Sequence, residues 1–161
     1  MDKAIADLFP DSFVDSELGK IPMGWRIGAL SDLSEFGRES INPGDSPEKI
    51  YDHYSLPAFD EGRVPKTEAG NQIKSNKLVV TTASVLLSKL NPHIPRIWLP
   101  SLASSRQSVC STEFIVAVAK LGCSREYLYS LFSSTNFAQV YSSLVTGTTG
   151  SHQRIRPESV L

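Results

Sequence analysis

The second half of the chain has the most regular arrangement of apolar and polar positions, and it predicts strands followed by helices. Residues 77–89 are rich in β-branched side chains with a break near Ala83–Ser84, which predicts two strands, the second ending at Asn91-Pro92. Segments 97–99 and 113–119 predict two further strands. The last of these is apolar without a break after its first residue, so we expect it to be buried on both faces or central in a sheet.

Two helices are predicted to follow these strands. We expect Ser124 to cap the first, Ser134 or Thr135 to cap the second, and Gly147 to end the second. Each helix has one apolar face, formed by Tyr127, Leu128, Leu131 and Phe132 in the first and by Phe137, Val140, Tyr141 and Leu144 in the second. Strands first and helices afterwards favour an α+β fold over a doubly wound one. The expected architecture is a curved, mostly antiparallel or mixed sheet with C-terminal helices.

The chain divides into a leader at 1–24 and a packed domain at 25–161. A short helical turn is predicted around 4–9, followed by a loop through glycines and prolines that leads to Trp25. We expect Trp25 to begin the packed domain.

The first part of that domain has weaker patterns. Residues 25–33 combine strand spacing with the spacing of a single helical turn, and 37–47 predict a loop. Trp25, Trp98 and Phe114 are expected in the core rather than as platforms for stacking bases.

Composition indicates one globular unit that needs neither disulfides nor a metal. The 161 residues are 40% hydrophobic and 20% charged, as in ordinary globular domains. Cys110 and Cys123 are predicted to be buried free thiols, because no histidine pair lies at zinc-finger spacing from them. No apolar run approaches the ~20 residues of a bilayer span, and the acidic N-terminus lacks a signal-peptide pattern. We therefore expect a soluble, cytoplasmic protein that has no membrane partner.

Charge is distributed unevenly although the formal net charge is only -1. Residues 1–25 contain five acids and two bases, a local charge of -3, whereas 63–106 contain seven bases and only Glu68 as an acid, a local charge of +6. A basic stretch of this kind is typical of a surface that binds phosphates, although a solvated surface with fluctuating sign is an equal alternative.

Motifs for catalysis are missing from the sequence. No segment matches a phosphate-binding glycine loop, a nucleophile elbow, a dinucleotide fingerprint or a metal-binding helix. Residues 91–94 superficially resemble the loop with which amino-methyltransferases hold a flipped adenine, but they lack its second proline and its aromatic residue. Glu68 and Glu113 stand alone, so they are expected to form ion pairs or to accept hydrogen bonds at strand ends, rather than to bind a nuclease metal. We expect no catalytic residue, cofactor or metal.

Residues 146–151 form a loop of small residues with two alternative interpretations. It is either a helix stop with a flexible connection, or a loop whose amides bind a phosphate while Gln153 or Arg154 reaches a base. A weaker alternative is a metal-independent hydrolase with a serine and a histidine drawn from Ser111, Ser151, His93 and His152.

Several short motifs occur in a characteristic order. The first is Leu18-Gly19-Lys20-Ile21-Pro22-Met23-Gly24-Trp25, and the others are Ile73–Lys77, Val85–Pro92, Ser111–Phe114 and Thr146–Arg156. Together they resemble the target-recognition domain in the specificity subunit of type I restriction-modification enzymes. The segment Ala6–Phe13 is similar to the one that precedes the second recognition domain in such subunits.

This resemblance implies a non-catalytic chain that reads one half of a bipartite site in double-stranded DNA. It would do so for the modification (methyltransferase) and restriction subunits of the intact complex. Loops would read the bases while the sheet holds the loops. The implied DNA contacts are Lys66, Thr67, Lys74 and Lys77 in one loop, Lys89, His93 and Arg96 near a strand end, Arg106 and Gln107, and finally Ser151, Gln153 and Arg154.

Two alternatives remain open at this point. His93 can equally be a packed, hydrogen-bonded imidazole beside Pro92 and Pro95. The chain as a whole can instead be a protein-binding adaptor whose basic face meets an acidic partner.

Specificity subunits usually have two recognition domains separated by long helices that pair in antiparallel fashion. We expect the first such helix to follow Leu161, so that the chain corresponds to a single domain or to a truncated half-subunit. The helices that resemble the docking surface for the modification subunits would then be missing. A monomer or weak dimer that still reads DNA is the expectation.

Overall fold

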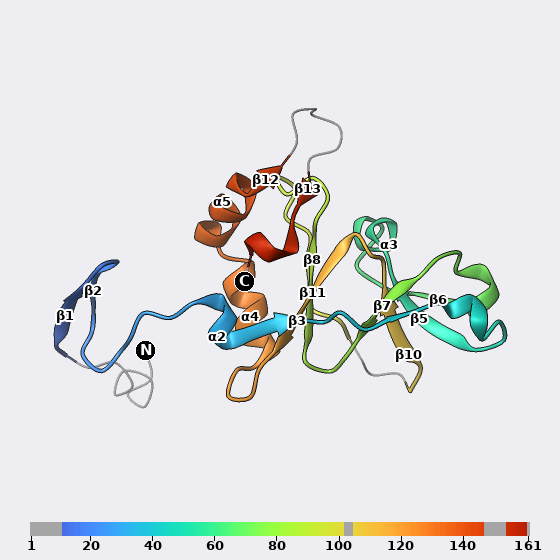
Figure 1. The fold of residues 1–161 in the computed structure, drawn as a ribbon, viewed down its shortest axis with the longest axis horizontal. Coiled ribbons are helices and arrows are strands. Elements are labelled where there is room, and N and C mark those ends of the chain that lie inside the picture. Colours follow the sequence, from blue (N-terminus) through green and yellow to red (C-terminus); the bar gives the residue numbers. More distant parts are fainter. Residues whose placement is uncertain (1–10, 102–104, 147–153, 161) are drawn as a thin grey trace.

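Two packed β-sheets form the body of the computed structural model, which describes residues 11–101, 105–146 and 154–160 (Figure 1). The four-stranded sheet has the order β3-β11-β8-β9, with bounds Ser34–Phe36, Phe114–Ala119, Ser84–Ser88 and Ile97–Trp98. The five-stranded sheet has the order β4-β7-β10-β5-β6, with bounds Ser40–Ile41, Lys77–Val80, Gln107–Cys110, Ile50–Tyr54 and Lys66–Ala69. Within the described residues, all strand pairs of the two sheets are antiparallel except β10 with β5, which is parallel. The predicted α+β fold with a mostly antiparallel sheet is confirmed.

Helices cover the other face of the four-stranded sheet. They are α2 (Leu30–Leu33), α4 (Arg125–Phe132) and α5 (Thr135–Ser143). Ser124 and Ser134 accept the backbone N–H of Tyr127 and Phe137 through their hydroxyls, at 3.1 and 3.2 Å, so both predicted caps are confirmed. α5 ends at Ser143, and Gly147, the predicted stop, lies outside the described residues. Of the predicted apolar faces, Tyr127 and Val140 are exposed.

The layer order explains why β11 and the middle of β8 are apolar at every position. Both strands are buried on two faces, as predicted for 113–119. Leu86 and Val116 pack toward the five-stranded sheet, and Val85 and Ile115 pack toward the helices. The predicted break near Ala83–Ser84 is also confirmed, because β7 ends at Val80 and β8 begins at Ser84.

The N-terminal part differs from the prediction. In place of a loop, β1 (Phe13–Ser16) and β2 (Gly19–Pro22) form a hairpin that stands away from the two sheets (Figure 1). The expectation that Trp25 lies in the core is wrong, because Trp25 follows this hairpin and is 54% exposed. Trp98 and Phe114 are core residues as predicted. The predicted turn at 4–9 lies outside the described residues.

Several other elements were not predicted. They are β3, β4, β5, β6, β10, α3 (Leu56–Asp60), β12 (Val145–Thr146), β13 (Arg154–Ile155), and three short 3-10 turns, η1 (Pro43–Asp45), η2 (Gly70–Gln72) and η3 (Pro157–Ser159).

Both cysteines are free; Cys110 is buried, whereas Cys123 is only partly buried. Burial raises the pKa of the Cys110 thiol to about 12. None of the described helices is long and apolar enough to cross a membrane.

Candidate nucleic-acid interface

A cleft on the five-stranded sheet is lined by two arginines, Arg63 and Arg106. Its volume is about 390 Å³, and it is lined by Asp52, Arg63, Val64, Pro65, Thr67, Ser101 and Arg106. We call it the Arg106 cleft. Asp52 on β5 and Thr67 on β6 are register partners, so their side chains lie on the same face of the sheet. The Asp52 Oδ1 oxygen accepts hydrogen bonds from Thr67 Oγ1 at 3.2 Å and from Arg106 Nε at 2.8 Å.

The predicted single loop with Lys66, Thr67, Lys74 and Lys77 is not formed. Lys66 and Thr67 begin β6, Lys77 begins β7, and Lys74 alone lies in the connection between these strands. Lys66 pairs with Glu61 at 3.1 Å. The reason for the error is that Lys66 and Thr67 pair with His53 and Asp52 of β5, a strand that their own sequence does not indicate.

Lys77 does not present its charge on the surface. It is 7% exposed, and its Nζ donates to the Ser75 carbonyl at 3.1 Å and to the Ser75 hydroxyl at 2.7 Å. Burial lowers the pKa of Lys77. Its expected role as a phosphate contact therefore does not fit the structure, whereas the neighbouring Lys74 is exposed.

A second group of candidates meets where β8 ends. The Lys89 amide donates to the Glu113 carbonyl at 2.8 Å, and the Lys89 carbonyl accepts from the Ile155 amide at 3.1 Å. Arg154, which forms a β-bridge with Leu90, pairs with the Glu113 carboxylate at 3.0 Å. The structure thus brings Lys89 and Arg154 together from positions far apart in the sequence.

The β8–β9 connection contains two more candidates with different surroundings. His93 is exposed, so the alternative of a packed imidazole is wrong. Arg96 donates to both carboxylate oxygens of Asp60, at 2.8 and 2.9 Å, and its side chain is only 13% exposed.

Gln107, a further candidate, accepts from Lys49 Nζ at 2.6 Å. Ser151 and Gln153 lie outside the described residues.

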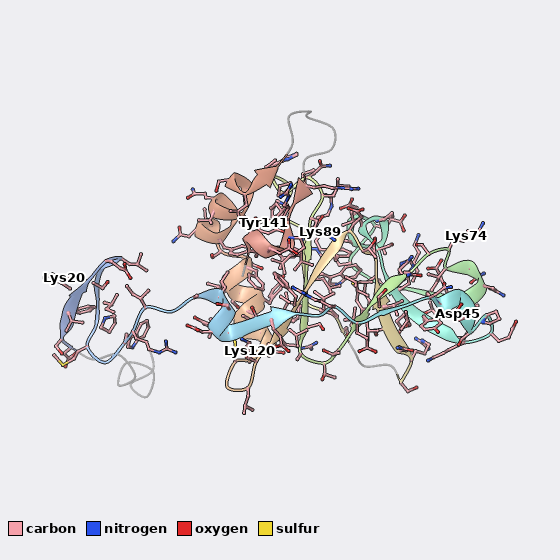
Figure 2. The ribbon with its side chains drawn as sticks, viewed as in Figure 1. Lys20, Asp45, Lys74, Lys89, Lys120 and Tyr141 are labelled. Atoms are coloured by element: carbon pink, nitrogen blue, oxygen red, sulfur yellow. The ribbon has the colours of Figure 1, made fainter. Side chains whose placement is uncertain are left out.

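Three of the seven bases in the stretch 63–106 form ion pairs with acids from outside it. Arg106, Arg96 and Lys66 pair with Asp52, Asp60 and Glu61. Lys74 and Lys89 form no ion pair within the described part of the chain, and Figure 2 shows them well apart. The local charge of +6 therefore overstates the positive surface that a ligand meets.

The described residues do not bring together the parts of a hydrolase or a metal site. Ser111 accepts the Glu113 amide at 3.2 Å through its hydroxyl and makes no hydrogen bond to His93. No group of three or more potential ligands that could hold a metal ion occurs among the residues that the structure describes. Glu113 forms an ion pair with Arg154, and Glu68 forms a hydrogen bond with His53, as their isolation predicted.

Comparison with solved structures identifies the fold. The HsdS subunit from Thermoanaerobacter tengcongensis matches 91% of this chain with a TM-score of 0.73 and 22% sequence identity. The chain has the fold of an HsdS target-recognition domain. A structure from work on complex assembly and conformational transition of the type I R-M system matches 88% of the HsdS-like chain with a TM-score of 0.70 and 26% identity. No family model and no curated protein matches.

The HsdS-like chain spans less than two fifths of either matched structure, 38% of the first and 37% of the second. The resemblance read from the ordered motifs is thus confirmed for the fold. Because the identity is low, the role of each side chain depends on the geometry of this chain itself.

The structure also reveals two basic residues of the HsdS-like domain that the sequence reasoning missed, Arg38 and Arg63. Arg38 and Lys89 line a cleft of about 340 Å³ between the two sheets, which also contains Glu158. Arg63 lines the Arg106 cleft, and its guanidinium lies 4.7 Å from the centre of the Phe59 ring. Arg38 lies outside the basic stretch, and no local pattern could have associated it with Lys89.

Proposed function

We propose that this HsdS-like chain recognises a specific sequence in double-stranded DNA. It reads one half of a bipartite site for the modification and restriction subunits of a type I restriction-modification complex, and it has no catalytic activity itself. The observation that carries the proposal is the HsdS fold, which extends over about nine tenths of the chain. A shared fold alone does not establish a shared function, so the proposal also needs charged groups of this chain that are placed to bind DNA.

Two kinds of contact support DNA binding. Lys74 and Lys89 are suited to anchoring phosphates, because no carboxylate competes for them within the described residues. Thr67 and Arg106 in the Arg106 cleft are suited to reading base edges. The proposed contacts also include His93 and Arg154, together with Ser151 and Gln153, which lie outside the described residues.

The deciding experiment measures binding of the full chain to labelled duplex DNA across a series of salt concentrations. A DNA-binding protein loses affinity linearly on a log-log plot, with a slope of about -0.9 for each phosphate contact. A selection from random duplexes then gives the preferred half-site. An acidic polypeptide of matched charge is the control for the adaptor alternative. Equal affinity for polypeptide and duplex, or no duplex binding at low salt, contradicts DNA recognition.

A further inference from the structure

We propose that Arg106 reads a guanine base and that Asp52 is the residue that positions it. This inference rests on the proposed function, DNA recognition, and assigns one specificity contact within it. The observations that carry it are the hydrogen bond between these two side chains, their unequal burial and the cleft into which they open.

Asp52 is well placed to fix the orientation of an arginine. Its strand, β5, lies between β10 and β6, and its side chain is 7% exposed. Oδ1 receives hydrogen bonds from both Thr67 and Arg106, so the carboxylate itself cannot rotate without losing both. A buried carboxylate that binds Nε fixes the plane of the guanidinium, and an arginine held in this way loses less entropy when it binds a ligand.

Arg106 nevertheless remains accessible. Its side chain is 44% exposed, and it lines the Arg106 cleft with Arg63 and Pro65. Guanine presents two acceptors, O6 and N7, on its major-groove edge, and the planar fork of an arginine matches this pair. Arg63 on the same cleft adds positive charge, which offsets the Asp52 carboxylate and favours the approach of a polyanion.

Arg96 provides the contrast within the same chain. Its Nε and Nη2 both bind Asp60, and its side chain is 13% exposed, as expected for an ion pair that serves stability. The side chain of Arg106, although it also binds a carboxylate, keeps more than three times that exposed fraction. The two arginines are therefore a matched pair: Arg96 stabilises the fold, and Arg106 is exposed enough to contact a base.

The test uses the full chain and the duplex that the wild type selects. Affinity is measured for that duplex and for each of its single base-pair variants, with Arg106→Lys as the variant and Arg96→Lys as the control. Arg106→Lys keeps the charge but removes the fork, so discrimination at one G·C pair should fall about 5- to 150-fold while binding to random duplex is unchanged. Arg96→Lys should leave every base preference intact.

Asp52→Asn tests the positioning role. It should relax the preference at the same G·C pair, and thermal unfolding of the variant reports any general loss of structure. If Asp52→Asn weakens binding to all duplexes equally and keeps that preference, Asp52 does not position Arg106 for recognition.

Two different experimental outcomes separate the assignment of Arg106 from DNA recognition by the chain. A wild-type chain that binds no duplex overturns DNA recognition. A wild-type chain that selects a site, with Arg106→Lys selecting the same site at the same discrimination, overturns only the assignment of Arg106.

Discussion

The Nδ1 nitrogen of His53 lies 2.6 Å from Oε2 of Glu68, on the adjacent strands β5 and β6. Nε2 of the same ring is buried and has no hydrogen-bond partner in the described residues. A neutral ring that donates from Nδ1 satisfies Glu68 and leaves only a lone pair at Nε2. Protonation would instead bury an unpaired N–H, which is consistent with the direction of the pKa: desolvation lowers the pKa of His53 below 6.5, outweighing the opposing effect of Glu68.

This arrangement predicts that acid destabilises the domain through His53. As pH falls below 6.5, the unfolded chain takes up a proton that the folded chain does not, so the free energy of unfolding decreases until the folded-state pKa is passed. Urea unfolding at pH 7.5 and at pH 5.5 measures the decrease. His53→Gln keeps a donor for Glu68 but does not titrate, so its stability should decrease less over this interval. An equal decrease in both proteins would assign the pH dependence to other groups.

The ion pair between Arg96 and Asp60 predicts a loss of stability without a loss of base preference. Arg96→Ala should lower the free energy of unfolding by about 1 kcal/mol, because a two-point contact with a half-exposed carboxylate is partly screened. A double-mutant cycle with Asp60→Ala isolates the pair, and the site selected from random duplexes should remain that of the wild type. A changed base preference would show that Arg96 contacts DNA, as its sequence position alone suggested.

Tyr141 attaches α5 to the four-stranded sheet (Figure 2). Its hydroxyl donates to the buried carbonyl of Ser88 at 2.9 Å, and its ring stacks on Phe137 at 5.3 Å between centroids. Tyr141→Phe should cost about 1 kcal/mol through the lost hydrogen bond, and Tyr141→Ala about 3 to 5 kcal/mol through the cavity that it leaves. Tyr129→Phe is the control, because the Tyr129 hydroxyl makes no hydrogen bond in the part of the chain that the structure describes. Equal effects of the two phenylalanine variants would contradict the role of the Ser88 contact.

The elements that sequence reasoning predicted correctly are those whose signal is local. The serine caps at Ser124 and Ser134 need only the next three residues, and the apolar run of β11 is buried whichever partners it has. β5 was missed because its Asp52 and His53 are polar and make sense only once Thr67, Arg106 and Glu68 lie against them.

The candidate site was less predictable than the fold, for the same physical reason. A positive charge in the sequence is suited to anchoring a phosphate only if no carboxylate neutralises it, and the carboxylates that pair with Arg96 and Arg106 precede them by 36 and 54 residues. Likewise, Lys77 is buried and Lys74 is exposed, although the sequence around them does not indicate this difference. Sequence could indicate the basic stretch but not which of its members face a ligand.

That difference between Lys74 and Lys77 gives the sharpest test of the proposed surface. Lys74→Ala and Lys89→Ala should each reduce the magnitude of the salt slope of duplex binding by about 0.9, because each removes one phosphate contact, and should weaken all sequences alike. Lys77→Ala is the matched control. It should leave the slope unchanged and lower the free energy of unfolding by about 1 kcal/mol, because its buried stem and its bonds to Ser75 are lost. Binding isotherms over a range of salt concentrations, together with urea unfolding, separate the two effects. If Lys77→Ala reduces the slope while Lys74→Ala does not, the exposed Lys74 does not mark the DNA-facing surface, and that surface lies elsewhere on the molecule.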